Sequence, residues 1–347
     1  MTPDPVLRAA PGGLYCEAGG FFVDPWRPAD VAVITHAHAD HARPGSRRYL
    51  ALASSVAVLR HRLGADIEIA GLQPGEPVTL GGARVSLHPA GHVLGSAQVR
   101  VETEAGVWVV TGDFKRAPDP TCAPFEPVAC DVLVTEATFA LPVYRWPAAS
   151  EVVGEIHAWW RANAAAGRPS ILFCYAFGKA QRVLAELAAC TDEPVYVHGA
   201  VEAITALYRI AGVAMLPTRL VESRRRSDYA EALVIAPPAA GGGPWMRRFG
   251  ACATGFCSGW MAIRGQRRRR GHDRGFVLSD HADWDGLMAT VEDSRAPRIL
   301  TTHGRDAALI RYLREQGWDA AALATSPGGQ QDGGPEPADE HGGAEGS

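Results

Sequence analysis

Val31-Ala32-Val33-Ile34-Thr35-His36-Ala37-His38-Ala39-Asp40-His41 is the most informative stretch of the sequence, because an apolar run leads directly into three imidazoles and a carboxylate. The apolar run predicts a buried strand. At the end of an extended strand, residues i and i+2 point the same way, so His36 and His38 can bind one metal ion together. Asp40 and His41 lie past the following turn and can reach a second ion. A loop of solvated histidines is the alternative, but few structural roles need so many ligands so close together; the stretch therefore predicts a binuclear metal centre.

The composition is that of an ordinary globular protein, with 47% hydrophobic and 21% charged residues over 347 positions. No segment has the ~18 uninterrupted apolar residues of a membrane span, and the first twenty residues have no apolar stretch of the kind that secretory signals carry. We therefore expect a cytoplasmic protein without membrane contact. Seven cysteines without a Cys-x-x-Cys spacing predict reduced thiols. The net charge of −4 neither requires nor excludes a nucleic-acid partner.

The pattern of apolar runs divides the chain into parts. The first part is rich in short strands, among them a hairpin over 97–111. Ser150 is the predicted N-cap of a helix over 151–166. After it, helices near 179–189 and 201–211 alternate with strands at 171–174, 195–197 and 233–236. This alternation predicts a parallel sheet with crossover helices. Strands at 276–279 and 299–302 then lead into histidine-bearing loops. We predict a metal-binding domain in two parts (1–150 and 263–325), an inserted domain (151–262) and a disordered tail (326–347).

Further candidate ligands follow other predicted strands. Two ions need about four ligands each, one usually shared, so three more are expected. His92 follows the strand at 85–88, Asp113 ends the hairpin, and His303 follows the apolar pair at 299–300. Taken singly, each has an ordinary reading as a loop or turn residue. Imidazole and carboxylate ligands suit zinc, manganese or iron better than calcium or magnesium.

The pattern His-x-His-x-Asp-His, followed by a distant histidine, aspartate and histidine, resembles the signature of the metallo-β-lactamase superfamily. The chain is more similar to its β-CASP branch, nucleases with a domain inserted in the lactamase-like fold, over about residues 12–325. This resemblance implies an α/β fold, an αββα sandwich with an inserted β-CASP α/β domain, and two divalent ions, Zn²⁺ or Mn²⁺. One ion would be bound by His36, His38 and His92, the other by Asp40, His41 and His303, with Asp113 as the bridge.

Three more residues match motifs of this family. Asp24 matches the first motif, an aspartate that supports the ligand loop without binding metal. Glu136 and His281 match the acidic and the following histidine motif of the β-CASP branch. Hydrolysis of a phosphodiester needs a proton for the leaving oxygen, so His281, kept partly protonated by Glu136, would be the general acid. Asp280 and Asp283 are alternative partners of His281. Asp40 completes the catalytic set that the resemblance implies.

A closer resemblance concerns the substrate. The run from Ser258 through Arg267-Arg268-Arg269-Arg270 to Trp284 is similar to a bacterial group of DNA exonucleases that are associated with ATP-dependent DNA ligases and related to the Artemis and Pso-type repair nucleases. It implies a 5′-directed DNA exonuclease in DNA repair, with DNA as substrate and a ligase as functional partner. Artemis-type enzymes commonly replace the last motif histidine, whereas RNA-processing members keep it. His303 is kept, so an RNA-processing nuclease is the alternative, and a thioester or lactone hydrolase a more distant one.

Nucleic-acid contacts are expected around the metal centre. Lys179 and Gln181 open a helix after a buried strand, where backbone donors and the helix dipole favour an anion. Ser96 follows a candidate ligand and can present its backbone N–H to a phosphate. Arg264 and Arg268 belong to a basic run of the kind that tracks a nucleic-acid backbone. The alternative for each of these cations is a solvated surface position.

Overall fold

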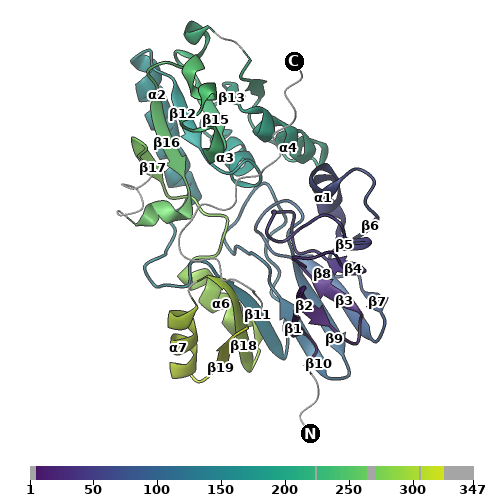
Figure 1. Cartoon of the computed structure of the whole chain (residues 1–347). Helices are drawn as coiled ribbons and strands as arrows, with labels where there is room; N and C mark the ends of the chain where they lie inside the picture. The colour runs from purple at the N-terminus through teal and green to yellow at the C-terminus, as the bar shows by residue number, and fades with distance from the viewer. Residues whose placement is uncertain (1–4, 223–224, 264–270, 305, 324–347) are drawn as a thin grey trace.

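The computed structural model describes residues 5–222, 225–263, 271–304 and 306–323, and only the backbone of 303 and 304. The predicted contacts Arg264 and Arg268, and the predicted tail at 326–347, lie outside the described residues. Within them the strands form three sheets. Two sheets stack into a sandwich, and the third lies above it with its own helices (Figure 1).

The first sheet of the sandwich has the strand order β1-β2-β3-β4-β5-β6 within the described part of the chain. β1, β2 and β3 are antiparallel to one another, whereas β3 to β6 run parallel. The strands are β1 (Arg8–Ala10), β2 (Gly13–Cys16), β3 (Phe21–Val23), β4 (Val31–Val33), β5 (Arg48–Leu52) and β6 (Ile69–Leu72).

The second sheet has the order β19-β18-β11-β10-β9-β8-β7. β7 to β10 are antiparallel, and β10, β11, β18 and β19 run parallel. The strands are β7 (Val78–Leu80), β8 (Ala83–Pro89), β9 (Ala97–Thr103), β10 (Gly106–Val110), β11 (Val132–Ala137), β18 (Arg298–Gly304) and β19 (Asp319–Ala322). β11 and β18 are neighbours in space, although the whole third sheet lies between them in the sequence.

Apolar side chains fill the space between the two sheets, since alternate residues of each strand face the opposite sheet. Helices cover the outer faces. α1 (Val56–Leu63) packs on the first sheet, and α6 (Trp284–Ser294) and α7 (Ala307–Glu315) pack on the second. The layers are therefore helix, sheet, sheet and helix, the αββα sandwich that was predicted.

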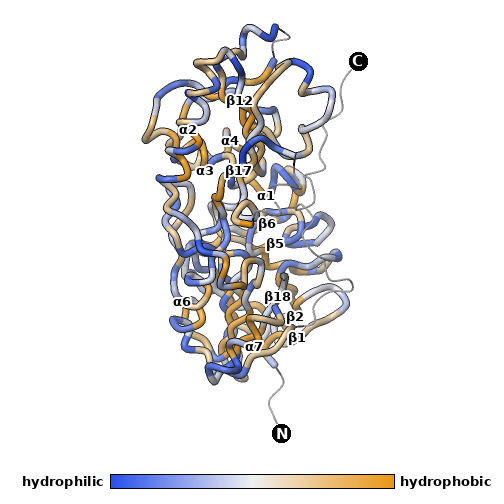
Figure 2. The backbone as a smooth tube through the Cα atoms, turned by 90° about the vertical axis from the view of Figure 1, so that its left-hand side faces the viewer, coloured by the Kyte–Doolittle hydropathy of each residue, from blue (hydrophilic) through white to orange (hydrophobic). Residues whose placement is uncertain are grey.

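The third sheet is parallel throughout the residues described, with the order β14-β13-β15-β12-β16-β17. Both of its faces are apolar and buried, as parallel sheets require; Figure 2 shows the hydrophobic colour of β12 in its interior. Its strands are β12 (Ser170–Phe173), β13 (Val195–Val197), β14 (Thr218–Leu220), β15 (Leu233–Ala236), β16 (Ala253–Cys257) and β17 (Arg274–Phe276). Its helices are α2 (Ala149–Ala165), α3 (Lys179–Leu187) and α4 (Gly199–Ile210). Short 3₁₀ helices occur in both parts of the described chain. η1 (Ala53–Ser55) follows β5 of the first sheet, and the others are η2 (Arg226–Tyr229), η3 (Pro238–Ala240), η4 (Pro244–Arg248) and η5 (Gly259–Ala262).

Two sequence predictions differ from the structure. Ser150 is not an N-cap, because the chain becomes helical directly after Pro147 and Ala148, and Ser150 lies inside the first turn of α2. The strand expected at 276–279 is β17, which ends at Phe276 and pairs with β16 in the third sheet. The domain boundary at residue 262 stays a prediction, and this pairing favours a later end of the insertion, after Phe276. No described helix has both the length and the apolarity that crossing a membrane requires, and the seven cysteines are all free thiols.

Candidate metal centre

The candidate ligands lie at strand ends on one side of the sandwich. His36 and His38 follow β4, and His92 follows β8. Asp113 comes after β10, in a turn where Gly112 has φ 56°. A Cβ on this glycine would lie 2.6 Å from the Thr35 Cβ, so the turn can pack against the histidine loop only with glycine at this position. Strand ends of both sheets thus bring together side chains that are distant in the sequence.

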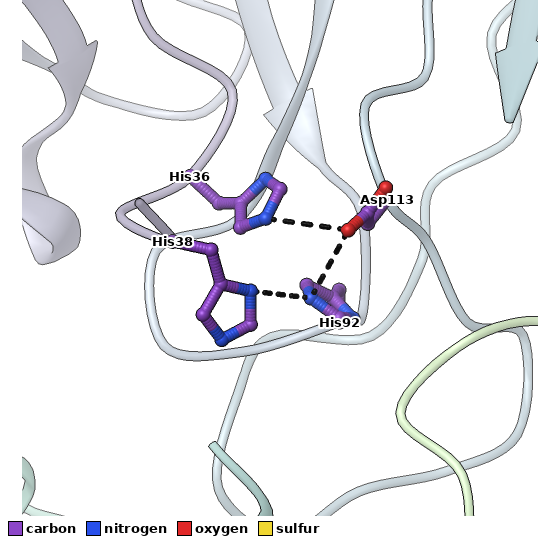
Figure 3. Close-up of side chains that lie close together, drawn as sticks. All are labelled: His36, His38, His92 and Asp113. Atoms are coloured by element: carbon purple, nitrogen blue, oxygen red, sulfur yellow. Dashed lines mark hydrogen bonds and ion pairs between the residues drawn. The ribbon is translucent and has the colours of Figure 1, made fainter. Parts of the chain in front are cut away.

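His36, His38, His92 and Asp113 form one buried group whose candidate ligand atoms all lie within 4.8 Å of one another (Figure 3). His92 Nε2 is 3.1 Å from His38 Nδ1 and 3.7 Å from Asp113 Oδ2, and His36 Nε2 is 3.4 Å from Asp113 Oδ2. Ligands at 2.0–2.1 Å around one tetrahedral ion are separated by about 3.3 Å. The four side chains therefore fit a single zinc-sized ion.

Hydrogen bonds on the far side of the rings support this fit. The Thr35 hydroxyl donates to Asp24 Oδ2, so it can only accept from His36 Nδ1, 3.0 Å away. This leaves the lone pair on His36 Nε2, which is buried and has no hydrogen-bond partner. His92 Nδ1 donates in the same way to the backbone oxygen of Asp280, at 2.7 Å. Such bonds fix the tautomer that presents the other nitrogen to a metal.

Asp113 presents its two oxygens to two different sets of side chains. Oδ2 lies toward His36 and His92, whereas Oδ1 is 3.5 Å from His41 Nε2. Asp40 Oδ2 is 3.7 Å from the same His41 nitrogen. A carboxylate that bridges two ions presents its oxygens in this way. We therefore propose a second metal position between Asp40, His41 and Oδ1 of Asp113. The backbone of His303 is in β18, and its side chain lies outside the described atoms; its role as a ligand stays a prediction.

Asp24 holds the histidine loop from behind. Its Oδ1 accepts the Thr35 backbone N–H at 2.8 Å, and its Oδ2 accepts from His41 Nδ1 at 2.8 Å. Asp24 has a left-handed φ of 44°, a backbone conformation that costs energy for a residue other than glycine and is often retained at functional sites. The supporting role predicted for Asp24 agrees with these contacts, and Thr35, which the sequence analysis did not single out, shares it.

The titration of the buried histidines suits metal binding. Burial and the nearby His41 lower the pKa of His36 to about 4, and burial with His281 and His36 lowers the pKa of His92 well below its usual value. Both rings are therefore neutral at pH 7, the form that binds metals. Burial opposes the charged form of His41 as well, but Asp113, Asp40 and Asp24 outweigh it and raise its pKa well above the usual value.

These pKa shifts predict the proton balance of metal binding. His36 and His92 have no proton to lose at neutral pH, whereas His41 must lose one to become a ligand, so of these three rings only His41 should release a proton when both positions are loaded. The affinity of the His41 position for metal should fall as pH falls, because a protonated His41 cannot act as a ligand. Calorimetric zinc titrations in buffers of different ionisation enthalpy measure the number of protons released. Proton release from all three rings would mean that His36 and His92 are charged in the free site, and would contradict this prediction.

Glu136 and His281 form a pair beside this group. His281 Nδ1 donates to Glu136 Oε2 at 2.8 Å. The other carboxylate oxygen, Oε1, accepts the Phe114 backbone N–H at 2.8 Å. Asp113, Glu136 and His281 again have candidate ligand atoms within 4.8 Å of one another. The structure thus places the predicted acid and its carboxylate next to the proposed bridge. The alternative partners are engaged elsewhere: Asp283 caps α6, and the Asp280 side chain pairs with Lys179.

A pocket of about 420 Å³ opens next to His281. It is bordered by loop and linker segments from both the sandwich and the inserted part, and its lining includes Lys115, Arg116, Arg182 and Trp146. Lys115 and Arg182 are buried and paired with Asp119, so the partly exposed groups among these four are Arg116, which pairs with Asp293, and Trp146.

Three predicted nucleic-acid contacts have other partners in the structure. The Ser96 hydroxyl accepts the backbone N–H groups of His92 and Val93, and the Ser96 N–H donates to the Val93 oxygen, so Ser96 shapes the ligand loop. Gln181 is buried, accepts from Gly178 and donates to Ala176. Lys179 is 3% exposed and its Nζ is 2.7 Å from Asp280 Oδ2. These side chains stabilise the fold around the site, because burial of polar groups requires such partners.

Comparisons with known proteins agree with the architecture. No family model matches the chain. Over 313 residues it is 32% identical to a protein named "Probable DNA ligase" from Opitutus terrae, a match that covers 90% of this chain and 30% of that protein. Over 133 residues it is 26% identical to an RNase J-like protein from Methanocaldococcus jannaschii. This match covers 36% of this chain and 32% of that protein. Over 161 residues it is 30% identical to the transcription termination factor FttA from Pyrococcus abyssi. This match covers 42% of this chain and 24% of that protein.

The chain therefore spans about a third or less of the length of these curated relatives. Among solved structures, a protein of unknown function from Enterococcus faecalis superposes with a TM-score of 0.53 at 13% identity, over 80% of this chain and 76% of that one. This last similarity concerns the fold alone. The relatives and the three-sheet architecture confirm the predicted fold class, a metallo-β-lactamase αββα sandwich with an inserted β-CASP α/β domain.

Proposed function

We propose that the chain is a metal-dependent phosphodiesterase, a DNA exonuclease directed at 5′ ends. The observation that carries this proposal is the junction of two groups at one carboxylate. Asp113 belongs both to the group with His36, His38 and His92 and to the group with Glu136 and His281. A binuclear metal site and a proton donor therefore lie within reach of one scissile bond.

The side chains divide the reaction between them. When bound, two divalent ions activate the attacking water and stabilise the charge on the phosphoryl oxygens. Asp113 and the histidines would hold and orient the ions. Glu136 holds His281 through Nδ1, so the proton for the leaving 3′-oxygen would come from His281 Nε2. The pocket beside His281 would receive the part of the strand that leaves.

Similarity to the protein named as a probable DNA ligase supports DNA as the substrate. That similarity covers nearly all of this chain but less than a third of the relative, so the relative joins a region of this kind to a longer chain named for ligation. We infer that the present chain trims DNA ends in repair, in functional association with an ATP-dependent DNA ligase. The 5′ direction follows from the resemblance to the exonuclease group.

An RNA-processing nuclease is the second candidate. The similarity to an RNase J-like protein and the retained His303 favour it. A thioester or lactone hydrolase of the same fold would need neither the inserted domain nor the pocket that opens beside His281.

Digestion of matched DNA and RNA single strands tests this proposal. Each strand is labelled at one end, and zinc or manganese is added to metal-stripped protein. Stepwise release of mononucleotides from DNA, starting at the 5′ end, is the expected result, and RNA should be cleaved far more slowly. Cleavage of RNA alone would assign the chain to RNA processing, and turnover of acyl thioesters with no cleavage of either strand would refute a nuclease.

A further inference from the structure

Five charged residues are buried together where the inserted part meets the sandwich: Lys115, Asp119, Lys179, Arg182 and Asp280, here called the buried ion cluster. Their side chains are at most 7% exposed. Lys115 pairs with Asp119. Arg182 Nε is 3.4 Å from Asp119, and its Nη1 is 3.5 Å from Asp280 Oδ1.

Stability alone does not account for this cluster. Moving charges out of water costs several kcal/mol per ion, and buried ion pairs can often be replaced by apolar residues at no loss of stability. The cluster also has three cations for two anions, with Glu186 at its edge, 3.7 Å from Arg182 Nε. In some proteins a group of this kind imposes a specific geometry, so the contacts of the cluster indicate its role.

That geometry concerns the segment returning from the third sheet. Arg182 Nη1 donates to the Ser279 backbone oxygen at 2.6 Å, and Lys179 holds the Asp280 carboxylate at 2.7 Å. Two cations of α3 thus hold two consecutive residues. The backbone oxygen of the second, Asp280, accepts the hydrogen bond from His92 Nδ1 at 2.7 Å, and the next residue is His281.

The inserted part also holds the His92 loop from another side. The Leu94 backbone N–H donates to the Tyr208 hydroxyl on α4 at 3.1 Å. Val93 and Leu94 pack with Phe177 and Tyr208 in one apolar cluster. The loop that carries His92 therefore contacts the segment just before α3, α4 of the inserted part, and the returning segment.

We propose that Lys179 and Arg182 are positioning residues: they fix Asp280, whose backbone oxygen orients His92 for the metal. This inference rests on the ligand role of His92 in the proposed function. It assigns to the inserted domain a part in assembling the metal centre, in place of the phosphate contact that the sequence predicted for Lys179. Lys179 acts on the metal through Asp280 and His92, without touching the substrate.

Lys179→Met tests this assignment through metal affinity measured without substrate. Residues that orient a metal ligand change affinity by 10–100-fold, and Lys179 acts one step further out, so we expect zinc to bind about 10-fold more weakly in competition with a coloured chelator. The KM for DNA and its salt dependence should stay unchanged. Lys179→Arg, which keeps the charge, should restore most of the affinity.

Two further variants serve as controls. Arg145→Met breaks an exposed ion pair with Asp285 near the same linkers, and should change neither zinc affinity nor KM. Lys179→Met/Asp280→Asn removes one cation and its paired anion together, so it keeps the test open if Lys179→Met does not fold. We expect the double variant to bind zinc as weakly as the single one.

Two results would overturn the proposal. Wild-type zinc affinity, with a raised KM and a salt slope lowered by about one, would make Lys179 a phosphate contact. Wild-type zinc affinity with an unchanged KM would make the cluster purely structural. Because zinc affinity is measured without nucleic acid, a chain that cleaves no DNA leaves this test intact, whereas a chain that binds no zinc refutes the metal centre itself.

Discussion

Asp113→Ala is expected to lose metal from both positions and to lower kcat by about 10³-fold or more. Asp113 directs one oxygen to His36 and His92 and the other to His41, so its removal would take a ligand from each of the two proposed metal positions. Metal ions contribute several kcal/mol of transition-state stabilisation, and each 1.36 kcal/mol corresponds to a factor of ten in rate. Elemental analysis of the purified variant, together with its turnover of labelled DNA, measures both effects.

Asp113→Asn is the matched control, because it keeps the shape of the side chain and removes its charge. An amide has one oxygen to offer, so this variant should retain more metal than Asp113→Ala but still lack one ion. Retention of both metals at wild-type turnover in Asp113→Ala would remove the bridging role from Asp113.

His281→Ala is expected to lower kcat by ~10²–10⁴-fold, the usual contribution of general acid–base catalysis, while metal content stays at the wild-type level. The reason is geometric: His281 is held by Glu136 beside the metal group, and the metal position of His36, His38, His92 and Asp113 is complete without it. Single-turnover cleavage combined with elemental analysis separates the two properties.

Glu136→Gln refines this prediction. The amide can still accept from His281 Nδ1 but no longer stabilises the protonated ring, so we expect a smaller loss of kcat than in His281→Ala. Loss of one metal from His281→Ala would contradict the assignment. It would indicate that Asp113, Glu136 and His281 themselves hold an ion.

The grouping of His36, His38, His92 and Asp113 was predictable because its signals are local. His36, His38, Asp40 and His41 follow a strand whose apolar run is visible in the sequence, and strand ends on one side of a sandwich converge. His92 and Asp113 follow the same rule. The parallel third sheet was predictable from the alternation of apolar strands and helices, and the strands at 195–197 and 233–236 have the bounds that were predicted.

The roles of the surrounding polar residues were not predictable in this way. A lysine at the start of a helix has the same sequence signal whether it binds a phosphate or pairs with Asp280, which lies about a hundred positions later in the chain. Lys115 and Asp119 had no signal at all, since burial depends on segments that are distant in sequence. Ser96 did have a local sequence signal, because a serine directly after a glycine is typical of a turn that the serine side chain closes. In the structure Gly95 has φ 73°, and the Ser96 hydroxyl accepts two backbone N–H groups of its own turn.

The contacts of the site also determine when it can exist during synthesis. His92 and its hydrogen-bond partner Asp280 are 188 positions apart, and Glu136 and His281 are 145 apart. A nascent chain that has emerged only as far as the third sheet already has His36, His38 and Asp113, but neither the proton donor nor the backbone oxygen that orients His92. A ribosome-bound fragment that ends before Asp280 would therefore lack the complete site, which can form only when translation has passed the whole insertion.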